Sequence, residues 1–240
     1  MSKSGRISEI AIEDPSTWMD RVFLTFDIDW AHDAVLSDTV DVVEAAGVRA
    51  TWFVTHRSRV VDRIGPNPAF ELGIHPNFNP LLQGDLTRAT DCGAEIDAML
   101  EIVPGCRSVR SHSVAQSGPI MRAFADRGLT HDTNDNIPEG AGMRLRPWRS
   151  STGMVKAPYC WADEHAWSRQ QSVDFRDIVN RIGLAIFDFH PIHVFLNTEA
   201  PSTYGTARPH LRDPKRLLGL RSESPLGARA ALERLLEVAT

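Results

Sequence analysis

The stretch Phe23-Leu24-Thr25-Phe26-Asp27-Ile28-Asp29-Trp30 decides how this chain folds and where its chemistry lies. It begins as a run of apolar and β-branched residues, which is typical of a buried strand. It ends in two carboxylates, and side chains at i and i+2 of a strand lie on the same face. Two carboxylates on one face repel each other unless a cation or a proton intervenes. We therefore expect Asp27 and Asp29 to form a metal site with a neighbouring base; an Asp that only caps the next helix is the structural alternative.

Predicted strands and helices alternate on both sides of this stretch. Apolar runs predict strands at 21–27, 49–55, 70–75, 108–112 and 184–189, shorter ones at 7–12, 129–131 and 154–156, and a continuation of the last strand at 194–196. Other patterns predict helices at 33–46, 94–102, 118–127, 173–182 and 228–238, and a Pro- and Arg-rich loop at 201–214.

This alternation is typical of an α/β protein whose parallel sheet is covered by helices. We expect one domain over residues 1–240, with a core at about 21–197 and a C-terminal loop and helix at 201–240.

The composition is that of an ordinary globular protein. Of 240 residues, 42% are hydrophobic, and the formal net charge of −5 argues against a nucleic-acid partner. The sequence has no apolar leader and no run of about 18 apolar residues, so we expect no membrane span. Three cysteines without a C-x-x-C spacing favour a reducing compartment. We therefore expect a cytoplasmic protein.

Polar side chains recur where the predicted strands end. Besides Asp27 and Asp29, these positions carry His75, Arg110, His112 and His190. The C-terminal ends of parallel strands meet at one edge of a sheet, so we expect these side chains to share one site.

A divalent metal ion, most simply zinc, suits this set of side chains. Asp29 and His75 would supply two ligands and leave open positions for catalysis. His112 is the preferred third ligand because imidazole suits zinc better than a neutral amide does. Asn79, four residues after His75, is the alternative.

The remaining residues suit proton transfer. Asp27 is the candidate general base, and a charge-assisted hydrogen bond from Arg110 would keep it ionised and oriented. His190 is the candidate general acid, whereas we expect His193 either to support the residues that line the site or to be structural. The segment 157–165 combines aromatic and acidic residues, and it is either a wall for a sugar ring or an ordinary exposed loop.

The same residues carry a family resemblance. Thr25-Phe26-Asp27-Ile28-Asp29 is similar to the T-F-D-x-D motif of the polysaccharide deacetylases, the NodB-homology or carbohydrate esterase family 4 group. His75-Pro76-Asn77-Phe78-Asn79 matches their H-x-x-x-H motif only in part, because Asn79 replaces the second histidine. Arg110-Ser111-His112-Ser113 is the counterpart of the arginine motif, and Phe187-Asp188-Phe189-His190 resembles the closing strand with its acid histidine. The likeness covers residues 21–197 and is greatest to the subgroup named after WbmS.

The resemblance implies a distorted (β/α) barrel with about seven strands, in which Asp27 is the base and Asp29 a metal ligand. It also implies metal-dependent hydrolysis of an acyl group, N-deacetylation above all, on a sugar or surface-polysaccharide precursor. Two alternatives stay open. One is a hydrolase of another carbon–nitrogen bond, such as a cyclic amide. The other is a catalytically degenerate relative that only binds glycan, which Asn79 keeps in play.

Overall fold

One nine-stranded sheet forms the centre of the computed structural model, which describes residues 3–166 and 172–240. The strand order is β6-β7-β5-β4-β3-β2-β1-β9-β8. The long central strands are β1 (Val22–Asp27), β2 (Ala50–Val54), β3 (Phe70–Ile74) and β9 (Ala185–Phe189). The short outer strands are β4 (Ser108–Val109), β5 (His131–Asp132), β6 (Trp148–Arg149), β7 (Val155–Lys156) and β8 (Trp161–Ala162). Neighbouring strands pair in parallel, except that β6 is antiparallel to β7.

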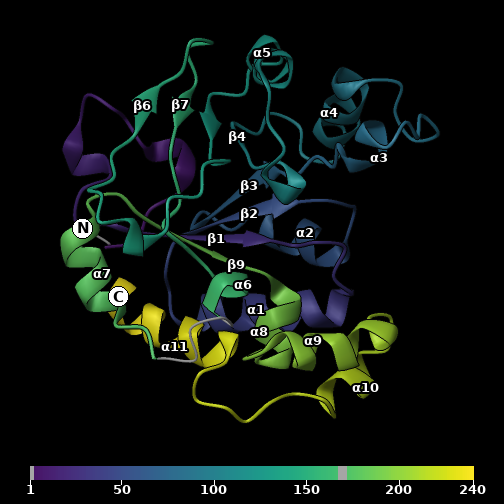
Figure 1. Ribbon diagram of the computed structural model, residues 1–240, viewed down its shortest axis with the longest axis vertical. Coiled ribbons are helices and arrows are strands. Elements are labelled where there is room, and N and C mark those ends of the chain that lie inside the picture. Colours follow the sequence, from purple (N-terminus) through teal and green to yellow (C-terminus); the bar gives the residue numbers. More distant parts are fainter. Residues whose placement is uncertain (1–2, 167–171) are drawn as a thin grey trace.

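The predicted α/β class is confirmed, with nine strands where about seven were expected. The sheet curls into a distorted, open barrel with β6 and β8 as its edges (Figure 1). Isolated bridges join Asn136, after β5, to Tyr159, before β8, and join Leu145, before β6, to Gly183, before β9. The two extra strands, β6 and β8, are pairs of residues that the sequence pattern does not predict.

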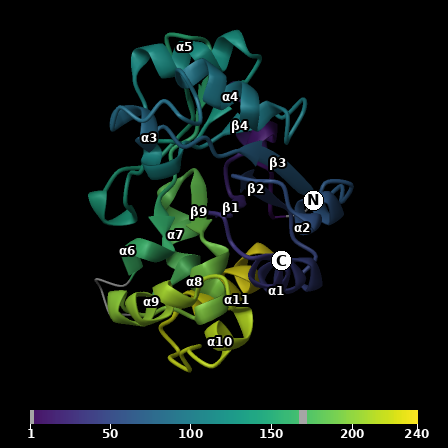
Figure 2. The ribbon, with the colours of Figure 1, turned by 90° about the vertical axis from the view of Figure 1, so that its right-hand side faces the viewer.

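Helices surround the strands. Viewed toward the C-terminal ends of the strands, α4 (Cys92–Leu100) and α5 (Gly118–Asp126) lie above the sheet (Figure 2). Below it lie α1 (Asp33–Ala45), α8 (Pro191–Leu196) and α11 (Ala228–Ala239). Two further helices are α2 (Arg59–Ile64) and α7 (Phe175–Ile182). Side chains of Ser58, Asp91, Ser117 and Asp174 accept a backbone hydrogen bond at the start of α2, α4, α5 and α7, as N-caps do.

Three predicted segments are wrong. Residues 7–12 contain the 3₁₀ helix η1 (Ile7–Glu9) instead of a strand, and the backbone N–H of Ile7 donates to the Thr51 hydroxyl. Residues 194–196 continue α8 instead of the strand, because Pro191 starts a helix without needing a partner for an N–H.

The predicted loop at 201–214 is largely helical. It contains α9 (Pro201–Ala207) and η5 (Arg208–His210), and α10 (Pro214–Leu218) follows at once. In α9 and α10 the proline stands at the first helical position, where its fixed φ favours the helix. Proline therefore starts helices in this part of the chain, although the sequence pattern predicts a loop.

Every residue of β1 is buried, including its last, Asp27, which is 4% exposed. The Phe26 ring stacks on Trp52 of β2, with ring centroids 4.2 Å apart, at the centre of the main core. A carboxylate at the end of such a strand needs a charged or hydrogen-bonded partner.

All three cysteines are free. Within the described residues, no helix has the length and apolar character that crossing a membrane requires.

Candidate active site

A cavity of about 380 Å³ opens at the C-terminal ends of the strands. Five of the seven predicted site residues line it: Asp27, Asp29, His75, His112 and His190. Each comes from a different strand end or from the loop after it, apart from Asp27 and Asp29, which both follow from β1. The structure therefore brings together side chains that are up to 163 residues apart, as Asp27 and His190 are.

A backbone turn places Asp29 in the cavity, whereas the sequence predicts that strand alternation places it there. Strand β1 ends at Asp27, so the i, i+2 alternation of a strand does not extend to Asp29. Asp29 and Trp30 instead adopt φ values of 39° and 54°, a region that few residues other than glycine occupy. The hydroxyl of Thr55 holds this turn by accepting the Trp30 backbone N–H at 3.0 Å. Strained turns of this kind persist where the surrounding structure enforces them, often at functional sites.

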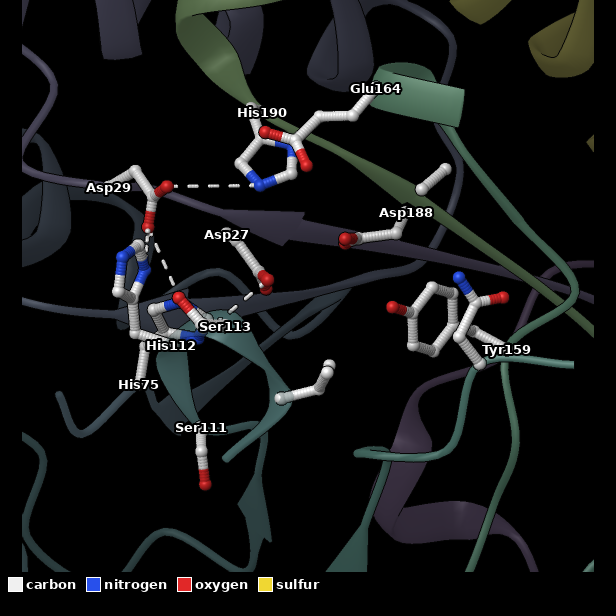
Figure 3. A pocket seen from close by; sticks show the side chains of 13 residues that line it. Asp27, Asp29, His75, Ser111, His112, Ser113, Tyr159, Glu164, Asp188 and His190 are labelled. Atoms are coloured by element: carbon white, nitrogen blue, oxygen red, sulfur yellow. Dashed lines mark hydrogen bonds and ion pairs between the residues drawn. The ribbon is translucent and has the colours of Figure 1, made fainter. Parts of the chain in front are cut away.

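Two imidazole rings converge on one oxygen of Asp29 (Figure 3). His75 Nε2 lies 3.3 Å from Asp29 Oδ1, and His112 Nδ1 lies 3.2 Å from the same atom. Ligand atoms about 3.3 Å apart are what a tetrahedral zinc with bonds of about 2.0–2.1 Å requires. The candidate ligand atoms of these three residues all lie within 4.8 Å of one another.

The second nitrogen of His75 supports the fit to a metal ion. His75 Nδ1 is buried without a hydrogen-bond partner, 3.7 Å from Asp27 Oδ2. Both ring nitrogens thus face carboxylates, although a neutral imidazole carries only one N–H. A cation bound between His75 Nε2 and Asp29 would remove the repulsion between the nitrogen lone pair and the carboxylate. The single N–H of the ring could then lie at Nδ1 and face Asp27. The donor set therefore fits a divalent metal such as zinc.

The residues of this candidate metal site shift one another's pKa. Burial alone would raise the pKa of Asp29, but hydrogen bonds with His112 and His75 hold it far below its usual range. Burial would lower the pKa of His75, yet the nearby carboxylates of Asp27 and Asp29 raise it. Asp29 is therefore ionised at neutral pH, as a metal ligand must be.

Asn79 lies apart from this group, as the first residue of the short helix α3 (Asn79–Leu82). It is not among the described residues that line the cavity. Its side-chain amide donates to the hydroxyl of Ser113 at 3.1 Å, in the turn η3 (His112–Val114) that carries His112. Of the two candidates for a third ligand, only His112 therefore contacts Asp29.

Arg110 lies behind the cavity between two carboxylates. Its Nη1 donates to Asp27 Oδ1 at 3.0 Å and also to Asp188 Oδ1. The guanidinium is 1% exposed and stacks between the rings of Phe53 and Tyr159, at 4.8 and 4.7 Å from their centroids. Burial would lower the pKa of Arg110, but Asp188 and Asp27 raise it, so the guanidinium stays charged. Burial raises the pKa of Asp188, and the charge of Arg110 opposes this.

His190 is held by Asp163, the first residue of α6 (Asp163–Ala166). The backbone N–H of His190 donates to Asp163 Oδ2 at 2.7 Å, and its Nδ1 lies 2.9 Å from Asp163 Oδ1. Its other nitrogen, Nε2, faces the cavity 3.8 Å from Asp29 Oδ2. Burial would lower the pKa of His190, but Asp163 above all raises it well above its usual value. An imidazolium in this position can give a proton to a group inside the cavity.

Several residues at the cavity have no role that the sequence pattern predicts. Asp188 left a signal, since it is the only charged residue in the apolar strand β9. Asp163, Tyr159 and Glu164 belong to the segment 157–165 that was considered for contact with a sugar. Glu164 lines the cavity, and a hydrogen bond with His193 lowers its pKa to about 2. His193 lies in α8 and contacts Glu164 and Thr198, outside the lining of the cavity.

Comparison with known proteins adds to this geometry. The family model described as "WbmS-like: Polysaccharide deacetylase" matches residues 24–208. A solved structure from Bordetella bronchiseptica, assigned as a polysaccharide deacetylase involved in O-antigen biosynthesis, is 44% identical; the match covers 99% of this chain and 98% of that chain with a TM-score of 0.93. A Mycobacterium smegmatis protein assigned as a polysaccharide deacetylase is 16% identical, with 97% and 87% coverage and a TM-score of 0.54, and bears on the fold alone. No curated protein matches the chain.

Proposed function

Because the chain belongs to the WbmS-like polysaccharide deacetylase family, we propose that it is a metal-dependent hydrolase of an N-acyl group on an amino sugar. N-acetyl is the simplest such group, and a surface polysaccharide or its precursor is the proposed substrate. The Bordetella relative, assigned to O-antigen biosynthesis, supports this choice of substrate class.

A single observation carries the proposal. Asp29, His75 and His112 converge at one point of a cavity that also contains Asp27 and His190. A degenerate relative that only binds glycan would have no need of this complete donor set. In this proposal His112, which contacts Asp29 from another strand end, replaces the second histidine that the motif lacks at Asn79.

Asp29, His75 and His112 would hold the divalent metal, with zinc as our proposed ion. When bound, such an ion polarises the acyl carbonyl and lowers the pKa of a water molecule. Asn79 supports the turn that carries His112, through its hydrogen bond to Ser113.

Proton transfer is the task of Asp27 and His190. Asp27 accepts a proton from the attacking water, whose hydroxyl group forms the new bond to the acyl carbon. The charge-assisted hydrogen bond from Arg110 orients the carboxylate of Asp27 at the cavity. His190 donates a proton to the nitrogen as the carbon–nitrogen bond breaks, so the products are a carboxylic acid and a free amine.

Substitution of Asp27 and of Asp29 should affect zinc binding and activity differently. Asp27→Asn should still bind one equivalent of zinc while amine release from a panel of N-acetylated amino sugars falls by about 100- to 10,000-fold. Asp29→Asn should lose both zinc and activity. Asp41→Asn, an exposed position on α1, is the matched control and should change neither. A wild-type protein that binds no zinc, cobalt or nickel and releases no amine would refute the proposal.

A further inference from the structure

The catalytic cavity has a second end, formed by Asp188 and Tyr159. Figure 3 shows Asp27 near the middle, with Asp29, His75 and His112 to one side and Asp188 and Tyr159 to the other. Asp188 and Tyr159 are 3% and 6% exposed, so little of either residue reaches solvent at this end, which we call the closed end. Glu164, by contrast, has a 52% exposed side chain and lies at the open part of the cavity.

The closed end contains two polar groups without partners among the described residues. The Tyr159 hydroxyl makes no hydrogen bond there, and it points toward Asp188 (Figure 3). Burial raises the pKa of Tyr159, so its hydroxyl stays neutral and can donate. The hydrogen bonds of Asp188, from Thr25 and Arg110, both go to Oδ1. Oδ2 of Asp188 is therefore an unused acceptor.

These two groups match a hydroxyl on the ligand. A hydroxyl donates to Asp188 Oδ2 and accepts from Tyr159. A methyl group at this position would leave both polar groups unpaired in a closed space, which is unfavourable. A carboxylate has no hydrogen to donate to Asp188 Oδ2, so it would leave that acceptor unpaired.

The closed end suits the smaller part of the substrate. When the scissile carbonyl lies beside Asp27, the acyl group and the sugar extend to opposite sides of it. A sugar ring within a polysaccharide must remain at the open side, where Glu164 lies. The short acyl chain then points toward Asp188 and Tyr159.

We propose that Asp188 and Tyr159 form the acyl pocket and select an acyl group that carries a hydroxyl, such as hydroxyacetyl, over one of the same size without it. This inference rests on the proposed function, because it places the scissile carbonyl beside Asp27. It narrows the substrate class to N-hydroxyacyl amino sugars.

Small hydroxamates test the pocket without turnover. Hydroxyacetohydroxamate and propanohydroxamate have the same number of heavy atoms and differ by a hydroxyl in place of a methyl group. Isothermal titration of the zinc-loaded protein should give about tenfold tighter binding of the hydroxyl compound, as for a hydrogen bond to a charged group. Equal affinities, or no binding of either compound, would overturn the inference.

Tyr159→Phe removes only the hydroxyl and keeps the ring that contacts Arg110. The preference should fall to within about threefold in this variant, because one of the two hydrogen bonds is lost. Tyr204→Phe is the matched control, since Tyr204 is the other tyrosine of the chain and lies outside the cavity lining. Tyr204→Phe should retain the tenfold preference. An unchanged preference in Tyr159→Phe would count against the pocket.

A turnover measurement separates this inference from the proposed function. The ratio of kcat/KM for N-hydroxyacetyl over N-propanoyl amino sugars should be about ten in the wild type and about three or less in Tyr159→Phe. Hydrolysis of both compounds at equal rates would overturn the acyl pocket and leave the proposed function standing. A hydroxamate preference without hydrolysis of any acylated amino sugar would support the pocket and count against the proposed function.

Discussion

Asp163 holds His190 at two points, by accepting its backbone N–H at 2.7 Å and by facing its Nδ1 at 2.9 Å. Asp163 is itself fully buried. The pair therefore fixes the position of the ring, directs Nε2 into the cavity and favours the protonated imidazole.

Asp163→Asn should impair the proposed acid without disturbing metal binding. The amide keeps the shape of the side chain but loses its charge and can present an N–H to Nδ1, which favours the wrong tautomer. We expect kcat to fall by about 100-fold or more, with zinc content unchanged. Steady-state kinetics and metal analysis would check this. Asp177→Asn, at an exposed ion pair on α7, should be neutral, and a kcat within threefold of wild type for Asp163→Asn would contradict the role.

His112 and Asn79 should differ sharply in their effect on the metal. Loss of a direct ligand in His112→Ala should weaken zinc binding by far more than 100-fold, whereas Asn79→Ala should weaken it by about tenfold at most. Competition with a chromophoric chelator measures both. His210→Ala serves as the histidine control outside the cavity. A larger loss for Asn79→Ala than for His112→Ala would reverse the assignment of the third ligand.

Zinc should also stabilise the folded chain. An ion that binds only the native state at 100 times its Kd adds about 2.7 kcal/mol, which is roughly 5–10 °C in Tm for a chain of this size. Calorimetry with and without a chelator should show this difference in the wild type and not in His112→Ala. A shift of equal size in both proteins would place the stabilising ion elsewhere.

Arg110→Met should be strongly destabilising because it leaves Asp27 and Asp188 buried without their cation. Breaking such a buried pair costs about 3–5 kcal/mol, and the added change Asp188→Leu should recover part of the loss. Urea unfolding measures these free energies. Arg63→Met, at an exposed ion pair, should stay within about 0.5 kcal/mol of the wild type.

The destabilisation by Arg110→Met should depend on pH in a defined direction. Burial raises the pKa of Asp188, and removing the charge of Arg110 raises it further. A carboxyl whose pKa is higher in the folded than in the unfolded state penalises folding once it is ionised. The stability lost in Arg110→Met should therefore be greatest at high pH and should shrink as pH falls below the folded-state pKa of Asp188. A loss that grows on acidification would contradict this account.

Two thiols should be inert in the native protein. Burial raises the pKa of Cys106 and of Cys160 to about 12, so very little reactive thiolate exists at pH 8. Alkylation with iodoacetamide, followed by mass spectrometry, should leave both unmodified until denaturant is added. Rapid native labelling of Cys160 would indicate that β8 and β9 open readily.

Much of the fold was predictable because its central strands are continuous apolar runs. The boundaries of β1, β2, β3 and β9 were predicted to within one residue, and the strand ends held most of the side chains that line the cavity. The edge strands β6 and β8 were not predicted, because each forms only where a neighbouring strand presents its edge.

The same distinction holds within the opening stretch, Phe23 to Trp30. Local chemistry was enough to single out Asp27 and Asp29, since two carboxylates after a buried strand need a cation or proton. The left-handed turn that carries Asp29 could not be predicted, because residues far along the chain, such as Thr55, hold it in place.

The sequence by itself determined the α/β class and the polar residues at the strand ends, because both follow from the order of apolar and polar residues along the chain. Only the tertiary structure decided which of these residues meet. It brought His112 to Asp29 and Asn79 to Ser113, and it paired Asp163 with His190 and Asp188 with Arg110. These contacts join residues between 27 and 83 positions apart, with distances set by the curl of the whole sheet, which no local pattern encodes.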